Sequence, residues 1–253
     1  MASWSNTRKY GYLTALIASI VIFVGVPTLL LLYRAPTCFD GKQNGGESGI
    51  DCGGACAKLC LADFAAPHIL WSYSTRVAPG VFNAVAYVQN PNQSVQASSM
   101  RYLFRLYDDQ GLLVAQRTGS AFIPAGQRLA VFEGGIQTGS RSPAKTTFEF
   151  TSDPEWRAGQ PFTSLRVTFV DIATSTSPSA EVRVENQALD RGFSDITAIL
   201  VLYDKDDNRV TFSKTVISKI LPGGSEILYF TWPEAFPSDI VRSEVLFSAP
   251  GSR

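Results

Sequence analysis

The clearest indication of the fold is the stretch Arg101-Tyr102-Leu103-Phe104-Arg105-Leu106-Tyr107-Asp108. Its even-numbered side chains up to Leu106 are apolar, whereas Arg101 and Arg105 fall on the opposite face. Because successive side chains of a β-strand point to opposite faces, this alternation predicts a strand with one packed and one hydrated face. The residues that follow, Asp108-Asp109-Gln110-Gly111, favour turns, so a hairpin is expected there.

The same pattern occurs again 96 residues later. Asn90 and Asp108 are 18 positions apart, and so are Asn186 and Asp204. The apolar positions between them are retained, which predicts two copies of one structural unit. The side chains that carry the pattern before each Asp are Tyr102, Phe104, Leu106 and Tyr107 in the first copy, and Ala198, Leu200, Leu202 and Tyr203 in the second.

Each copy is predicted to be a small antiparallel β-sandwich. Short runs rich in Val, Ile, Thr, Tyr and Phe alternate with turn residues over about 88 residues, as is typical of such domains. We expect the first sandwich over residues 66–152, a linker over 153–161 and the second sandwich over 162–250. The predicted fold class is therefore mainly β, with helix only near the N-terminus.

A family resemblance rests on the same residues. Phe104-Arg105-Leu106-Tyr107-Asp108 has the form F-x-L-Y-D and, with Val88-Gln89-Asn90 before it, resembles the FxLYD family of immunoglobulin-like β-sandwich modules. The second copy has Leu200-Val201-Leu202-Tyr203-Asp204, in which Leu replaces Phe at the first position. The resemblance implies two tandem immunoglobulin-like domains of the kind found as non-catalytic extracellular parts of bacterial envelope proteins.

The N-terminal region contains 24 consecutive uncharged residues, from Tyr10 to Tyr33. At about 1.5 Å of rise per residue a helix of this length would span about 36 Å, more than the ~30 Å hydrocarbon core of a bilayer. We expect a transmembrane helix over residues 10–33 that is retained as a signal anchor. A buried core helix would need a polar face. A cleaved signal peptide would end in a small-x-small site, which the stretch Leu32-Tyr33-Arg34-Ala35-Pro36-Thr37 lacks.

Basic residues do not set the orientation of this helix, because Arg8 and Lys9 on one side are balanced by Arg34 and Lys42 on the other. All four cysteines follow the span and lie close together, which is typical of compartments where disulfides persist. We therefore expect residues 1–9 in the cytoplasm and the remainder outside it.

The segment 38–60 is rich in glycine and poor in apolar residues, so it needs cross-links to keep one conformation. Four cysteines can form two disulfides with three pairings, and the sequence does not choose among them. Their spacing differs from the paired C-x-x-C pattern of structural zinc sites. The order Cys, Asp-Gly, Asn-Gly, Glu, Asp-Cys-Gly-Gly, Cys, Cys resembles a cysteine-rich motif of secreted and surface proteins. The four cysteines of this predicted knot are Cys38, Cys52, Cys56 and Cys60.

Oxygen-bearing side chains in the knot leave two interpretations open. Four of them recur every three or four residues among flexible glycines and could converge on calcium, a cation that prefers oxygen ligands. The alternative is that they cap turns and bind no metal. The four residues are Asp40, Asn44, Glu47 and Asp51.

The sequence offers little for catalysis or for nucleic-acid binding. Lys plus Arg and Asp plus Glu are balanced at 22 each, which leaves no excess positive charge for a phosphate backbone. His68 is the single histidine and has no catalytic motif around it. Trp71 is expected in a sandwich core, and Trp156 and Trp232 are expected at the junction between the domains. We therefore predict a protein that is not an enzyme and that has no cofactor, unless the oxygen-bearing side chains of the knot bind calcium.

The function indicated by these features is a single-pass, membrane-anchored, extracytoplasmic binding or scaffold role at the cell envelope, with a protein partner that the sequence does not name. The alternative is a structural subunit of a pilus, secretion or division complex, in which the helix would pack against other helices.

Overall fold

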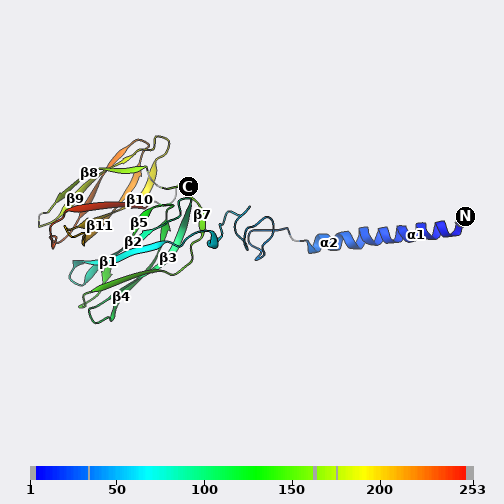
Figure 1. The fold of residues 1–253 in the computed structure, drawn as a ribbon, viewed down its shortest axis with the longest axis horizontal. Helices are drawn as coiled ribbons and strands as arrows, with labels where there is room; N and C mark the ends of the chain where they lie inside the picture. The colour runs from blue at the N-terminus through cyan, green and yellow to red at the C-terminus, as the bar shows by residue number, and fades with distance from the viewer. Residues whose placement is uncertain (1–3, 34, 162–163, 175, 249–253) are drawn as a thin grey trace. The chain divides into compact units, whose positions relative to one another are not determined.

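The computed structural model describes residues 4–33, 35–161, 164–174 and 176–248 (Figure 1). Residues 1–3 of the expected N-terminal segment, Arg34, and residues 162–163, 175 and 249–250 of the expected second sandwich lie outside these ranges. The described chain is mainly β, with one apolar helix at the N-terminus, so the predicted fold class is confirmed. Contacts divide it into two compact units, residues 1–56 and 57–253.

The first unit begins with one interrupted helix. It comprises α1 (Trp4–Ile20), a π-helical turn η1 (Val21–Gly25) and α2 (Val26–Leu32). Pro27 has no backbone N–H to donate, and the turn before it is wider, with the N–H of Val26 donating to the carbonyl of Val21. The stretch Lys9–Thr28 is long and apolar enough to cross a membrane.

The helix is followed by the cysteine-rich segment, which contains no regular strand or helix before η2, a 3-10 turn at Leu61–Asp63. Cys38 and Cys56 form a disulfide. Cys52 and Cys60 are also disulfide-bonded, and no cysteine is free. The prediction of two disulfides is confirmed, and the structure supplies the pairing that the sequence left open.

The second unit contains the thirteen strands that the described residues form. The first sandwich pairs one sheet of order β1-β2-β5 with a second of order β4-β3-β6, to which β7 adds by pairing with β3 (Figure 1). All of these pairings are antiparallel. The strand bounds are β1 (His68–Ala78), β2 (Val81–Gln89), β3 (Val95–Tyr107), β4 (Leu113–Ile123), β5 (Arg128–Gln137), β6 (Lys145–Phe150) and β7 (Trp156–Ala158).

Apart from β7, which has no counterpart among the described residues, the second sandwich has the same arrangement in the same chain order. One sheet has the order β8-β9-β12 and the other the order β11-β10-β13, again with antiparallel pairing. Strand for strand, β8 corresponds to β1, β9 to β2, β10 to β3 and so on to β13 and β6. The bounds are β8 (Leu165–Ala173), β9 (Ser179–Asn186), β10 (Phe193–Tyr203), β11 (Arg209–Ile220), β12 (Ser225–Thr231) and β13 (Arg242–Ser248).

Each sandwich has its own hydrophobic core, and the expected positions of three tryptophans require correction. Trp156 lies on β7, inside the segment expected to be a linker, and is buried in the first core. Trp232 is buried in the second core, where its ring contacts Phe236 edge to face. The junction between the sandwiches instead contains Trp71, which was expected in a core. The sequence next to each tryptophan does not indicate which face of a sheet its ring occupies.

A third hydrophobic cluster joins the two sandwiches. It contains residues of β2 and β5 from the first and of β10, β11 and β13 from the second, so the sheet β1-β2-β5 packs on the sheet β11-β10-β13. β2 and β10 are consequently buried on both faces, with an uninterrupted run of buried residues in each strand. The buried members of this cluster are Val85, Tyr87, Ala130, Ile199, Val201, Tyr203, Phe212 and Leu246.

Candidate binding surface

The acidic side chains of the knot hold its turns together. The carboxylate of Asp51 accepts hydrogen bonds from the backbone N–H groups of Asp40 (2.9 Å) and Gly41 (3.0 Å). The carboxylate of Asp40 accepts from the N–H of Lys42 (3.0 Å) and the side-chain amide of Asn44 (2.9 Å). The amide of Asn44 is the main cause that lowers the pKa of Asp40, so this carboxylate is ionised. These contacts are those expected of side chains that cap turns.

Glu47 also bonds to the backbone, at the N–H groups of Asn44 (3.2 Å) and Asp51 (3.3 Å). Among the described residues, the group of acidic, Cys and His side chains whose ligand atoms all lie within 4.8 Å of one another is Cys38, Glu47 and Cys56. Two of these are joined in a disulfide and have no thiolate to offer. The four predicted calcium ligands thus share a hydrogen-bonded loop, but Asp40 and Asp51 do not join Glu47 in such a group.

The residues of the F-x-L-Y-D motif divide between core and turn. Phe104 and Leu106 are fully buried in the first core. Asp108 accepts hydrogen bonds from the N–H groups of Gln110 (3.1 Å) and Leu112 (2.9 Å), which lowers its pKa and closes the β3–β4 turn. Tyr107 ends β3 and is half-buried.

The residues of the second motif, Leu200-Val201-Leu202-Tyr203-Asp204, also divide between core and turn. Leu200 and Leu202 are buried in the second core. Asp204 accepts from the N–H groups of Asp206 and Asn208, both at 2.9 Å, and these bonds lower its pKa. Asp204 therefore serves the turn between β10 and β11.

Two buried asparagines have structural roles that the sequence analysis did not assign. The side-chain amide of Asn90 donates to the carbonyls of Val95 and Pro124, both at 2.8 Å. Asn186 donates in the same way to Arg191 (2.8 Å) and Leu221 (3.0 Å). Their place at the start of each repeated pattern was the only signal that could have indicated this role.

A partly buried polar cluster lies at the junction of the sandwiches. The hydroxyl of Tyr87 donates to Glu244 at 2.5 Å, and the hydroxyl of Tyr203 donates to the same carboxylate at 3.1 Å. The guanidinium of Arg242 lies 3.5 Å from the centre of the Tyr203 ring. Burial, and then the charge of Glu244, raise the pKa of Tyr203 to about 12. Burial also raises the pKa of Tyr87, so both hydroxyls stay protonated as donors.

Cations of β11 cover aromatic rings on the facing sheet. Arg209 lies 5.0 Å from the ring of Trp71 and 5.7 Å from that of Tyr73, and Lys214 lies 5.0 Å from the ring of Phe132. Such cation–π contacts stabilise a junction most where water is excluded. The contact between the sandwiches thus pairs aromatic residues on one sheet with cationic residues on the other.

No family model matches this chain, and no curated protein matches its sequence. Among solved structures, a transglutaminase of red sea bream is similar over 72% of the chain, with 13% identity and a TM-score of 0.24. The chain spans 29% of the length of that enzyme. The tandem CBM22 domains of Xyn10C from Paenibacillus barcinonensis align over 74% of the chain and 92% of their own length, with 10% identity and a TM-score of 0.16.

The sheet β8-β9-β12 has large apolar side chains on its outer face, which we call the outer β8-β9-β12 face. Phe169 is 47% exposed, Ile227 40% and Tyr229 64%. The alternate residues of β9 and β12 point into the second core, so the exposure follows from the period of the strands. Arg183 lies 6.0 Å from the ring of Phe169. Aromatic residues and Arg are enriched in protein-binding surfaces.

This exposed face is the counterpart of a face that is covered in the first sandwich. In β1 and β2 Trp71 lies opposite Tyr87, and at the corresponding position of β8 and β9 Phe169 lies opposite Arg183. Trp71 packs against the junction with the second sandwich, whereas Phe169 is solvent-exposed. The comparison identifies the outer β8-β9-β12 face as the strongest candidate binding surface among the described residues.

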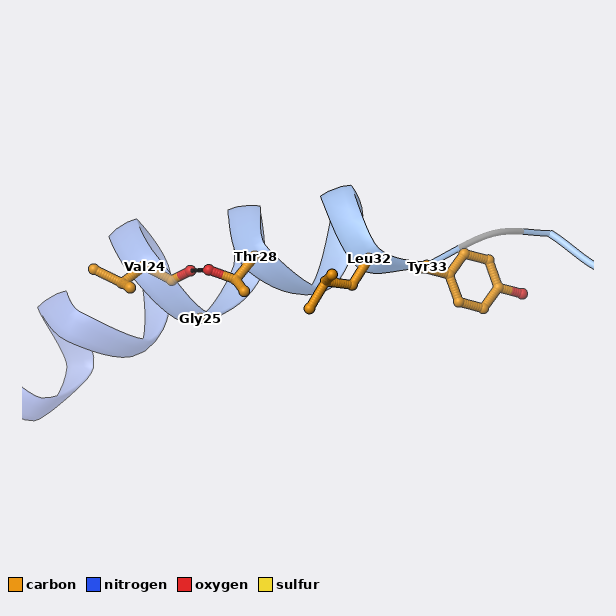
Figure 2. A pocket seen from close by; sticks show the side chains of 5 residues that line it. All are labelled: Val24, Gly25, Thr28, Leu32 and Tyr33. Atoms are coloured by element: carbon orange, nitrogen blue, oxygen red, sulfur yellow. Dashed lines mark hydrogen bonds between the residues drawn. The ribbon is translucent and has the colours of Figure 1, made fainter.

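A second surface feature is a shallow groove along the N-terminal helix, lined by Val24, Gly25, Thr28, Leu32 and Tyr33 (Figure 2). The hydroxyl of Thr28 donates to the carbonyl of Val24 at 2.6 Å and is therefore satisfied within the helix, as an apolar surrounding requires. The groove has no charged lining residue.

Proposed function

We propose that this protein is a single-pass, membrane-anchored binding or scaffold protein with an extracytoplasmic ectodomain and no catalytic activity. The apolar helix supports the anchor, since Lys9–Thr28 is long and apolar enough to span a bilayer. The two disulfides support an oxidising compartment for the residues that follow. Residues 1–9 would then lie in the cytoplasm.

The ectodomain consists, in this proposal, of two tandem immunoglobulin-like modules of the FxLYD kind. Support comes from the shared strand order of the two sandwiches and from the matching asparagines and turn aspartates described above. Modules of this kind bring a rigid surface to a partner, and fold alone does not name that partner.

The binding surface in this proposal is the outer β8-β9-β12 face, and its partner is a protein. The observation that carries this assignment is the exposure of Phe169, Ile227 and Tyr229 on a face whose counterpart is buried. Apolar side chains of this size are usually covered when they occur together on a sheet. The mixed charges of Glu181 and Arg183 between them favour a protein surface over a lipid one.

Photo-crosslinking tests the anchor and the surface separately. A benzophenone amino acid replaces Phe23 in the helix, Phe169 on the candidate face or, as a control, exposed Leu189 in the β9–β10 loop. Under irradiation in intact membranes we expect lipid adducts at position 23, a discrete protein adduct at position 169 and neither at position 189. Absence of lipid adducts at position 23 refutes the anchor, and absence of a protein adduct at position 169 refutes the surface.

Orientation is tested by protease protection in sealed vesicles of known sidedness. We expect the ectodomain to be cleaved only from the side that is topologically outside the cytoplasm. Cleavage from the cytoplasmic side alone would contradict the proposed topology.

A further inference from the structure

We propose that the partner of the outer β8-β9-β12 face is a second copy of this protein, which binds through the outer face of its β4-β3-β6 sheet. The two copies would then associate head to tail. This inference rests on the binding surface proposed above and names its partner.

The contact between the two sandwiches of one chain provides the geometry. There, the sheet β1-β2-β5 packs on the sheet β11-β10-β13, which is not its counterpart in the second sandwich. Because the two sheets in this contact are not counterparts, each sandwich keeps one sheet whose outer face is uncovered. A second chain can bind such a face through the same kind of contact, so contacts of this type can be repeated. The faces left over are those of β8-β9-β12, the counterpart of β1-β2-β5, and of β4-β3-β6, the counterpart of β11-β10-β13.

The first of these faces retains the aromatic character of its covered counterpart. Phe132 lies opposite Val85 in the first sandwich, and Tyr229 lies opposite Glu181 at the corresponding position of the second. Phe169 likewise stands where the first sandwich has Trp71. Trp71 and Phe132 of the first sandwich, which pack at the junction, therefore have exposed aromatic counterparts in the second sandwich, namely Phe169 and Tyr229.

The second face presents the cations that such rings would need. Arg101 is exposed and Arg105 half-exposed on β3, with Leu103 between them, and Lys145 is exposed at the start of β6. Their apolar neighbours in sequence point into the first core, so these side chains occupy the outer face. Glu149 lies among them and pairs with Arg105 at 2.8 Å. The chemistry matches that of Arg209 and Lys214 over the aromatic residues at the existing junction.

The net charges of the two faces are opposite. The outer β8-β9-β12 face has three acidic residues and two basic ones, and the outer β4-β3-β6 face has three basic residues and one acidic one. Complementary charge promotes encounter and selects the register of unlike faces. The acidic residues of the first face are Asp171, Glu181 and Glu185, with Arg166 and Arg183 beside them.

Sedimentation velocity on the full chain in detergent tests this proposal through two charge-reversal variants. One is Arg101→Glu with Arg105→Glu, and the other is Glu181→Arg with Glu185→Arg. We expect the unmodified chain to associate in a concentration-dependent manner, more strongly at low salt, and each variant alone to associate at least about tenfold more weakly. An equimolar mixture of the two variants should recover a complex, because each supplies the intact face that the other lacks.

The matched control reverses two exposed charges outside these faces, Lys58→Glu with Arg191→Glu, and should associate like the unmodified chain. The inference is overturned if the unmodified chain is monomeric, if both face variants associate normally, or if their mixture does not recover the complex. A monomeric chain that still forms a protein adduct at position 169 would leave the binding surface intact and reject only the second copy as its partner.

Discussion

At the scale of single residues, the buried asparagines fix the geometry of each sandwich. Asn90 and Asn186 each bridge two backbone carbonyls and, through the side-chain oxygen, accept the N–H of the residue two positions later, Asn92 (3.0 Å) or Ala188 (3.1 Å). Backbone polar groups buried without a partner are costly, so a side chain that satisfies three of them at once stabilises the loop it crosses.

Removal of one of these side chains should destabilise its sandwich strongly. We expect Asn90→Ala to lower the free energy of unfolding by about 3 kcal/mol, because it leaves the carbonyls of Val95 and Pro124 unsatisfied. Asn186→Ala should cost a similar amount. Urea denaturation followed by tryptophan fluorescence measures both. Asn208→Ala, at an exposed turn, is the matched control and should cost less than about 1 kcal/mol. An equal effect of Asn90→Ala and the control would contradict this role.

The raised pKa of Tyr203 predicts a loss of stability in alkaline solution. Its pKa is raised from 10.0 to about 12 in the folded protein by burial and by Glu244. The contribution of the protonated Tyr203 hydroxyl to the stability of the folded protein is therefore complete below pH 10 and is lost as the pH rises towards 12. Between pH 8 and pH 11 we expect the unmodified chain to lose about 1 kcal/mol more than Tyr203→Phe does. Urea unfolding at the two pH values measures the difference, and equal losses in both proteins would refute the assignment.

At the scale of elements, the knot is stabilised by covalent bonds and turn caps because it has almost no apolar side chain to bury. Phe39 and Ile50 are highly exposed, and its buried hydrophobic residues are Cys56 and Cys60. Its acidic oxygens are engaged by backbone N–H groups of the same loop. Such a segment depends on its disulfides for a defined shape.

We expect the knot to resist proteolysis equally well with calcium and with a chelator, since its carboxylates already bind the backbone. Asp51→Ala should accelerate cleavage between Cys38 and Cys52 several-fold under both conditions, because the N–H groups of Asp40 and Gly41 lose their acceptor. Lys42→Ala is the control and should be cleaved at the rate of the unmodified chain. Limited proteolysis with mass spectrometry gives the rates. Protection that appears only with calcium would instead assign the four oxygen-bearing residues to a metal.

The strand β7 lies in the segment that was expected to be a linker, and it forms because it packs against residues that are distant in sequence. β7 is three residues long and exists because Trp156 is buried in the first core and its strand pairs with β3. A segment this short has no periodicity to detect, and the flanking Pro154 and Gly159 are typical of linkers. By contrast, the long alternating pattern of β3 was sufficient to predict it.

At the scale of the whole molecule, the two sandwiches share one hydrophobic contact. Each of the strands β2 and β10 has one face in the core of its own sandwich and the other face in the junction. Arg76 and Glu234 form an ion pair across the same boundary at 3.1 Å, but both are largely exposed and contribute little. The apolar cluster, the Tyr87–Glu244 hydrogen bond and the cation–π contacts of Arg209 and Lys214 therefore couple the two domains.

Trp71→Ala should weaken this coupling. The ring packs against the junction cluster and lies 5.2 Å from that of Tyr87, so we expect a loss of about 2–3 kcal/mol and unfolding that separates into two transitions. Phe169→Ala, at the counterpart position on the uncovered face, is the matched control and should cost less than about 1 kcal/mol. Calorimetry gives both quantities, and a single unchanged transition in Trp71→Ala would show that the sandwiches are coupled by other contacts.

The properties that could be read from the chain are those that depend on local pattern. Alternation around Phe104 and Leu200 predicted the strands, the uncharged run from Tyr10 predicted the apolar helix, and the cysteine density predicted two disulfides. Whether the four carboxylate and amide residues of the knot bind calcium stays a prediction; in the folded chain they contact backbone N–H groups and one another.

The properties that could not be predicted from the sequence are those that depend on which surfaces pack against one another in the folded chain. The pairing of Cys38 with Cys56, the cores that bury Trp156 and Trp232, and the covering of Trp71 but not Phe169 all depend on contacts between residues far apart in sequence. Alternation tells which side chains share a face of a sheet. It cannot tell whether that face meets a second sheet or water, because the free energy that decides between them comes from the partner surface.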